Sequence, residues 1–287
     1  MRRSVGVLGV ALLVAALTPV MASASPASVP HRAAAATSPA WTLGGAKCSL
    51  IDVPAADGTR PVGIGTCPGV RPGAIVQTEV GLCTLNFLFT TPDGERFIGT
   101  AGHCILGEGG PTGDNAGEKT WPKGQGPEAK DSTGHRIGEF AYAILQDPKD
   151  FSLIRLDPGV KASPELCDFG GPTGINDDIG AGTRTLEYWG NGIGIGSVLP
   201  ARSAIADGFP NADHVYALGL ALPGDSGSAV ITDDGRAVGV LVTTGVHGFG
   251  YDQNGLDFGT MGITRLAPQL AQASKVLGLK LSLVTAK

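Results

Sequence analysis

Two short segments of the sequence carry side chains that could move a proton to and from a nucleophile. Residues 100–104, with the sequence TAGHC, surround His103 with small side chains. Such neighbours would let the imidazole lie against the backbone with its far nitrogen exposed, as a general base requires. Asp150 directly precedes the strand-like run FSLIRL, and a carboxylate there could fix the imidazole tautomer and stabilise the imidazolium. His103 and Asp150 are therefore the candidate base and its orienting acid.

The third segment, GDSG at residues 224–227, is the most specific of the three. The flanking glycines permit a tight backbone path. That path could aim the backbone N–H groups of Gly224 and Ser226 at one point beside the serine hydroxyl, and such converging donors stabilise an oxyanion. The segment differs from the nucleophile elbow of α/β-hydrolases, which needs Gly-x-Ser-x-Gly, because position 228 is serine. Ser226 is the candidate nucleophile.

Each segment taken alone also has an ordinary structural explanation. A histidine beside a cysteine is commonly structural, and GDSG is a frequent composition of surface turns. Asp150 could be a solvated aspartate at a strand end, and Asp147 and Asp157 are near enough in sequence to compete with it. The order of the three favours catalysis, because His, then Asp, then Ser is the order of chymotrypsin and differs from that of subtilisin and the α/β-hydrolases.

Together the three segments resemble the signature segments of the chymotrypsin-like and trypsin-like serine proteases, over roughly residues 81–277. Pro223, the short interval from Asp150 to Ser226 and an export signal are more similar to the bacterial secreted branch. The resemblance implies an all-β fold of two packed six-stranded antiparallel barrels. It places His103 and Asp150 in the first barrel and Ser226 in the second. It also implies that no cofactor or metal is needed, and that Cys83 and Cys104 form a disulfide.

Two departures from the family pattern concern the residues beside the nucleophile. No cysteine directly precedes Gly224, so the usual bridge next to the specificity pocket is missing. The sequence also lacks an Ile-Val-Gly-Gly start for the mature chain, so activation by a buried new N-terminus is not expected. Without the positive charge of such a terminus, Asp225 needs another cationic partner, an arginine that the sequence does not single out.

The resemblance also locates the primary specificity pocket. The position six residues before Ser226 would form its base, and the predicted lining residues are Leu220, Ala221, Thr243 and Thr244. No acid occurs in residues 216–224, so a cationic side chain would be buried without a partner, which is costly. We therefore expect cleavage after apolar or aromatic residues. In a shifted alignment an acid would reach the pocket and favour Lys or Arg; the candidates are Asp207, Asp213 and Asp257.

The elements that must position these residues are predicted to be short strands. The chain has 45 Gly and 20 Pro but only 6% aromatic residues, a composition typical of many strands joined by tight turns. Hairpins are expected over residues 85–100, around a turn at 91–94, and over 228–242, around a turn at 233–235; residues 252–255 mark a third turn. A terminal helix is indicated by four residues on one face, Leu266, Leu270, Ala273 and Leu277.

The N-terminus has the features of an export signal. Arg2 and Arg3 precede an apolar stretch, and small residues at 22–24 offer a cleavage site. The apolar stretch is shorter than the ~20 residues that span a bilayer. The expected organisation is a signal peptide at 1–24, a linker or short pro-segment at 25–40, an N-terminal barrel at 41–165, and a C-terminal barrel plus helix at 166–287. The product is expected to be secreted, free of the membrane after signal removal, and monomeric.

Charge and cysteine content limit the classes of partner. The formal charge of -5 with no basic run gives no indication of nucleic-acid binding, and no cysteine or histidine spacing suggests a metal site. Five cysteines in an exported chain leave at least one without an intramolecular partner. Besides the Cys83–Cys104 pair, proximity in sequence makes a Cys48–Cys67 bridge plausible, with Cys167 unpaired.

The sequence thus predicts a secreted serine endopeptidase that acts on protein or peptide substrates. Two alternatives remain open at this stage. A catalytically silent relative could use the same fold as a binding protein, although intact His103, Asp150 and Ser226 argue against it. An esterase could use the same serine on small substrates, because the acyl-transfer chemistry is shared.

Overall fold

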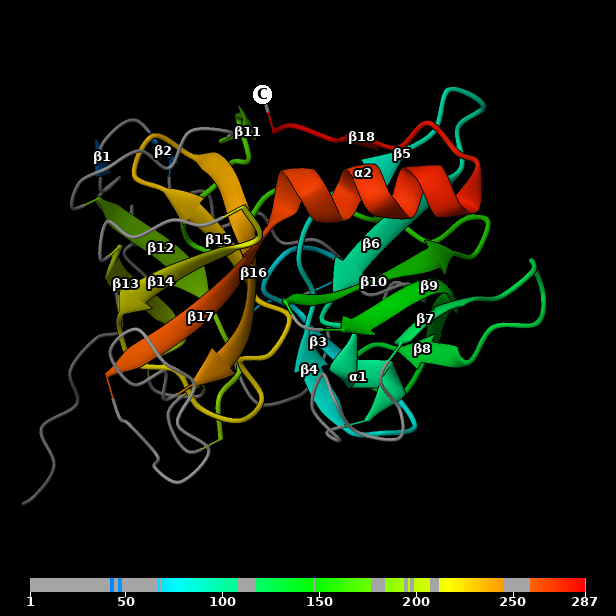
Figure 1. Cartoon of the computed structure of the whole chain (residues 1–287), viewed down its shortest axis with the longest axis horizontal. Coiled ribbons are helices and arrows are strands. Elements are labelled where there is room, and N and C mark those ends of the chain that lie inside the picture. Colours follow the sequence, from blue (N-terminus) through cyan, green and yellow to red (C-terminus); the bar gives the residue numbers. More distant parts are fainter. Residues whose placement is uncertain are drawn as a thin grey trace, which may run out of the picture. The chain divides into compact units, whose positions relative to one another are not determined.

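The computed structural model describes residues 42–43, 46–47, 67, 69–107, 117–146, 148–176, 184–193, 196, 199–206, 212–244 and 259–286. Ala40–Lys287 form one compact unit, in which the strands belong to two large sheets and one short pair, β1 (Thr42–Leu43) with β2 (Ala46–Lys47) (Figure 1). The predicted signal peptide, the linker at 25–40 and the third turn at 252–255 lie outside the described residues.

The first sheet is antiparallel and curls into a half-barrel. Its pairing order is β18-β5-β6-β10-β9-β8-β3-β4, and β7 pairs with β9 at the side of this path. The strands are β3 (Ile75–Gln77), β4 (Leu82–Thr84), β5 (Leu88–Thr90), β6 (Arg96–Thr100), β7 (Gly117–Thr120), β8 (Glu128–Lys130), β9 (Arg136–Gln146), β10 (Lys149–Leu156) and β18 (Ser282–Leu283). The last of these comes from the C-terminal end of the described chain, which the sequence pattern did not indicate.

The second sheet closes on itself. Six of its strands form a ring in the order β16-β15-β12-β13-β14-β17, and the β17–β16 pairing completes the barrel. β11 (Gly174–Ile175) adds to β16 in the parallel sense. The strands of the ring are β12 (Thr185–Trp189), β13 (Ala201–Ala206), β14 (His214–Leu218), β15 (Ala229–Thr232), β16 (Arg236–Thr244) and β17 (Thr260–Arg265). The predicted all-β class with a C-terminal helix is confirmed, with one closed six-stranded barrel and one half-barrel sheet.

Local sequence signals gave several of these elements correctly. β5 and β6 form the predicted hairpin around residues 91–94, and β15 and β16 form the one around 233–235. The terminal helix is α2 (Leu266–Leu277), and it ends at Gly278 in the left-handed conformation that glycine favours. Figure 1 shows the chain leaving α2 and returning as β18 beside β5.

β10, the strand that carries Asp150, does not alternate between buried and exposed residues. Nearly every residue of β10 is buried, on both faces. The reason is its central position between β6 and β9, where Phe151, Leu153 and Ile154 all join one hydrophobic core. The polar side chain of Ser152 is also buried, and its hydroxyl donates to the Ala101 carbonyl at 2.8 Å. This bond ties β10 to the segment that carries His103.

The disulfides include one pairing that the sequence did not predict. Cys67 is bonded to Cys167, so the suggestion of a Cys48–Cys67 bridge with Cys167 unpaired was wrong. Proximity along the chain was a poor guide, because the fold brings together residues 100 positions apart. Cys83 is bonded to Cys104, and Cys48 lies outside the described residues. In the part of the chain that the structure describes, no helix has the length and apolar character needed to cross a membrane.

Candidate active site

His103 and Asp150 are held together by two hydrogen bonds. His103 opens α1 (His103–Leu106), a single turn that follows β6. Its Nδ1 lies 2.7 Å from Asp150 Oδ2, and its backbone N–H donates to Asp150 Oδ1 at 3.0 Å. Both side chains are largely buried, with 16% and 12% of their surface exposed. The carboxylate therefore fixes the imidazole through the ring and the main chain at once, with Nδ1 as the protonated nitrogen.

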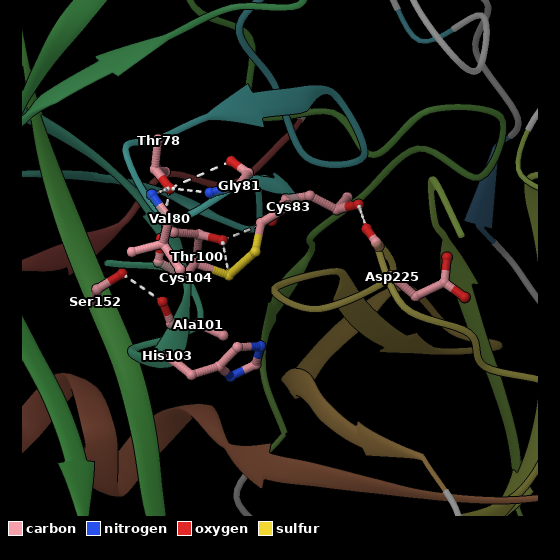
Figure 2. Close-up of a disulfide and its surroundings, with 12 residues drawn as sticks. Thr78, Val80, Gly81, Cys83, Thr100, Ala101, His103, Cys104, Ser152 and Asp225 are labelled. Carbon is pink, nitrogen blue, oxygen red and sulfur yellow. Dashed lines mark hydrogen bonds between the residues drawn. A yellow bond between two sulfur atoms is a disulfide. The ribbon is translucent and has the colours of Figure 1, made fainter. Parts of the chain in front are cut away.

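Asp157, one of the two competing aspartates, does not share this position. Asp157 follows the opposite end of β10, where its carboxylate binds Arg136 at 2.8 Å. Asp147 lies outside the described residues. Figure 2 shows the His103 ring extending from α1 toward the side of the segment that carries Asp225, with the Cys83–Cys104 disulfide above it in this view.

The backbone around Ser226 is fixed by hydrogen bonds that its carbonyl groups accept. The carbonyl of Pro223 accepts from the N–H of Ile193 at 2.8 Å. The carbonyl of Asp225 accepts from the backbone and the hydroxyl of Ser228, at 3.0 and 2.6 Å. Because the C=O and N–H of a trans peptide point in opposite directions, the N–H groups of Gly224 and Ser226 are turned to the other side.

Neighbouring N–H groups of this loop behave differently. Those of Asp225 and Gly227 donate to the carbonyls of Leu222 and Leu241, both at distances below 3.0 Å. Within the described residues, the N–H groups of Gly224 and Ser226 have no intramolecular acceptor. The loop therefore has two backbone donors close to Ser226 in sequence, the kind of group from which an oxyanion hole is built.

The loop of residues 222–228 carries the candidate nucleophile and is called the nucleophile loop below. It packs directly against the segment that leads to His103. The carbonyl of Ser226 accepts from the N–H of Thr84 at 2.8 Å. A Cβ atom on Gly227 would lie 2.2 Å from Thr100 Oγ1 and 3.1 Å from the backbone nitrogen of Ala101. Glycine is required here by this close approach. The structure thus brings the candidate base, its acid and the candidate nucleophile into adjoining segments.

Asp225 has the cationic partner that the sequence could not identify. Its carboxylate is fully buried and is bound by both terminal nitrogens of Arg202 from β13, one of them at 2.6 Å. The backbone N–H groups of Gly192 and Leu222 add hydrogen bonds of 2.6 and 2.9 Å. A Cβ atom on Gly190 would lie 2.2 Å from Asp225 Oδ1. Residues 189–192, WGNG, therefore make room for a buried ion pair that anchors the nucleophile loop.

Several residues of this site were not found from the sequence: Thr84, Gly190, Asn191, Gly192 and Arg202. A weak signal existed in the two glycines that flank Asn191, since glycines on both sides of a polar residue suggest close backbone packing. No pattern distinguished Arg202 from the other basic residues, because its partner lies 23 positions away on a separate element.

The structure describes the side chains of three predicted pocket residues, Leu220, Ala221 and Thr243. Leu220 is 40% exposed, and its carbonyl accepts from Arg202 Nη1 at 2.9 Å and from the Tyr188 hydroxyl. Ala221 is buried beside it. Thr243 is half-buried on β16, two residues beyond Leu241, which pairs with the nucleophile loop. The side chain of Thr244, together with Asp207 and Asp257, lies outside the described residues.

One group of potential metal ligands lies at the site. Atoms of Cys83, His103 and Cys104 lie within 4.8 Å of one another. The two sulfurs are joined in a disulfide, whereas metal coordination requires the thiolate. These three residues therefore do not form a metal-binding set.

Comparison of the sequence with family models and with curated proteins gives no match. The structure, in contrast, is similar to solved bacterial proteases. The Nocardiopsis protease shares 18% identity and a TM-score of 0.50, over 75% of this chain and 98% of that one. Thermobifida fusca protease A shares 16% identity and a TM-score of 0.49, over 76% and 99%. Cellulomonas bogoriensis chymotrypsin shares 16% identity and a TM-score of 0.45, over 75% and 99%.

At these identities the likeness establishes the fold and does not extend to activity. The chain has the chymotrypsin-like two-barrel fold of bacterial serine proteases.

Proposed function

We propose that the protein is a secreted serine endopeptidase with His103, Asp150 and Ser226 as its catalytic triad. The observation that carries the proposal is the doubly hydrogen-bonded pair of His103 and Asp150, with 2.7 Å between Nδ1 and Oδ2. The loop that carries Ser226 supports it, because the N–H groups of Gly224 and Ser226 have no acceptor among the described residues. The fold shared with bacterial proteases supports the same reaction class.

The reaction would proceed through an acyl-enzyme. His103 takes the proton of the Ser226 hydroxyl while the oxygen attacks the peptide carbonyl, and the N–H groups of Gly224 and Ser226 bind the oxyanion. His103 then passes its proton to the leaving amine, and Asp150 stabilises the imidazolium throughout. Water, deprotonated by His103, releases the acyl group from Ser226.

A fluorophosphonate probe followed by peptide mapping tests the nucleophile. The expected result is a single modified residue, Ser226. The Ser226→Ala variant should lose labelling and nearly all peptidase activity, with kcat lower by several orders of magnitude, and keep its thermal unfolding temperature. Labelling at another residue, or full activity of the variant, would refute the assignment.

The two alternative functions give different results in parallel assays. A silent relative acting as a binding protein would resist the probe despite an intact fold. An esterase would hydrolyse small activated esters and leave peptides uncut. The endopeptidase proposal requires hydrolysis of an internal peptide bond by the wild type, lost in Ser226→Ala.

The proposed cleavage preference is for apolar or aromatic residues. In the proposed pocket, Leu220 and Ala221 offer no charge, and each buried methylene contributes about 0.8 kcal/mol. A peptide-library digest tests this preference. Cutting after Lys or Arg would show instead that an acid reaches the pocket.

Secretion is proposed from the predicted signal peptide at 1–24, and the two disulfides suit an oxidising compartment. We propose a monomer acting on protein or peptide substrates.

A further inference from the structure

Thr84, the last residue of β4, makes two hydrogen bonds to the nucleophile loop. Its N–H donates to the carbonyl of Ser226, and its Oγ1 donates to the carbonyl of Gly224, each at 2.8 Å. Its own carbonyl accepts from Thr100 Oγ1 at 2.9 Å. The residue is fully buried. One residue of the first sheet thus holds the carbonyls on both sides of Asp225.

Asn191 fixes the direction of the Thr84 hydroxyl. Its Nδ2 donates to Thr84 Oγ1 and to the carbonyl of Gly73, both at 2.9 Å. Because the hydroxyl oxygen accepts this bond, its proton is directed to the remaining acceptor, the carbonyl of Gly224. Asn191 also contacts the loop itself, since a Cβ atom on Gly224 would lie 2.7 Å from the Asn191 carbonyl oxygen.

Gly224 is the point of the loop that most needs such restraint. Its φ of +101° lies in the region that glycine adopts freely. The peptide plane before it is held by the bond from Ile193 to the Pro223 carbonyl. The plane after it is held by Thr84 Oγ1. The Gly224 N–H lies in the first of these planes, and the fixed second plane limits the rotation about the Gly224 backbone bonds that would turn it. In the same way, the Thr84 N–H holds the plane that follows Ser226. A donor stabilises an oxyanion best when its direction is fixed before reaction.

The same contacts connect the loop with the candidate base. Thr84 follows Cys83, which is bonded to Cys104, and Cys104 follows His103 in α1 (Figure 2). The base and the oxyanion donors are therefore positioned by one short path of covalent and hydrogen bonds.

We propose that Thr84 and Asn191 are positioning residues, which hold the N–H groups of Gly224 and Ser226 in the direction that stabilises the oxyanion. This inference rests on the proposed endopeptidase function. Neither side chain touches the reacting atoms in the proposed reaction, so both act through the loop.

The test compares Thr84→Val with Thr84→Ser. Valine has nearly the shape of threonine and keeps the backbone N–H that binds Ser226, but it lacks the hydroxyl. Because removal of a direct oxyanion donor lowers kcat by 10²–10³, loss of its support should lower kcat by about 10–100-fold, with KM changed less than about twofold. Affinity for a peptide boronate, which forms the tetrahedral adduct, should fall by the same factor as kcat/KM. Thr84→Ser should restore kcat.

Thr232→Val is the matched control. Thr232 is equally buried, and its hydroxyl bonds to Asp234 and Arg236 at the β15–β16 turn, away from the loop. This variant should lower the unfolding temperature and leave kcat unchanged. If Thr84→Val also lowers only the unfolding temperature, the residue has a purely structural role and the inference is wrong. Should Thr84→Val fail to fold, Asn191→Ala must show the same fall in kcat.

A second readout separates this inference from the proposed function. Hydrogen exchange of the peptide spanning residues 222–228 should be faster in Thr84→Val than in wild type, whether or not the protein cuts peptides. Unchanged exchange overturns the positioning role. A wild type that the fluorophosphonate does not label overturns the proposed function instead.

Discussion

Asp150 has two separate tasks at His103, because one oxygen binds the ring and the other binds the backbone N–H. An asparagine at this position would keep a carbonyl oxygen for one bond but place an N–H donor at the other. The imidazole would then take the opposite tautomer, with its proton on the nitrogen that should accept from Ser226.

We therefore predict that Asp150→Asn lowers kcat by about 10⁴ near neutral pH without changing the fold. The control is Asp157→Asn, at the far end of β10, which should change kcat less than about twofold. Steady-state kinetics on a peptide substrate measure both. A comparable loss in Asp157→Asn would mean that the effect comes from the strand as a whole and not from the contact with His103.

Glu187 on β12 is a buried carboxyl group outside the candidate site. Burial, and then the charges of Asp233 and Asp168, raise its pKa from 4.5 to about 7. The folded state therefore holds a proton that the unfolded state releases at lower pH. Between about pH 4.5 and 7 the folded protein binds more protons, so its stability falls as pH rises through this range.

We predict that the free energy of unfolding from urea titration is larger at pH 5 than at pH 8. Glu187→Gln, which is neutral at both values, should reduce this difference. Glu79→Gln, at an exposed position, is the control and should leave it as in wild type. An unchanged pH profile in Glu187→Gln would show that other groups dominate the dependence.

At the scale of elements, β13 is joined to the nucleophile loop by the buried pair of Arg202 and Asp225. Arg202 also lies over the ring of Tyr188, 4.9 Å from its centre. Both charges are removed from water, with side-chain exposures of 4% and 0%. Loss of one partner would leave the other charge buried and uncompensated, which is far more costly than loss of a surface pair.

We predict that Arg202→Met destabilises the fold by about 3–5 kcal/mol and lowers peptidase activity, because Asp225 precedes Ser226. Arg136→Met is the comparison, since Arg136 binds carboxylates at a partly exposed position and should cost about 1 kcal/mol or less. Urea unfolding measures both. Equal losses would show that the buried pair has no special role in holding the loop.

At the scale of the whole molecule, the Cys67–Cys167 disulfide closes a loop of 100 residues that contains all the strands of the first sheet except β18. The C-terminal residues fix the same region from the other end of the chain. The N–H of Val284 donates to Leu88 at 2.8 Å, and that of Ala286 donates to Pro172 at 2.9 Å. The segment that forms strands β3 to β10 is thus closed by the disulfide and bonded at Leu88 to the C-terminal residues.

We predict that replacing Cys67 and Cys167 together by serine lowers stability by about 4–5 kcal/mol, because closure entropy rises with loop length. The Cys83/Cys104 double variant, with a separation of 21 residues, should lose about 3 kcal/mol. Denaturant unfolding of both, with peptide mapping without reductant, provides the measurement. Recovery of Cys67 linked to Cys48 would contradict the pairing.

The sequence by itself determined the features that depend on neighbouring residues. The β5–β6 and β15–β16 hairpins follow from turn residues between apolar runs, and α2 follows from the spacing of Leu266 and Leu270. The segments that carry His103, Asp150 and Ser226 were recognisable because each motif is contiguous. Their order and resemblance also gave the fold class.

Only the tertiary structure decided which distant residues meet. Asp225 pairs with Arg202, Thr84 with Asn191 and Cys67 with Cys167, at separations of 23, 107 and 100 positions. No periodicity or local preference links such residues. The first two contacts arise from the folding of the second barrel and from the packing of its loops against β4, where burial makes each charge and carbonyl require a partner. The disulfide joins the segments that precede β3 and follow β10.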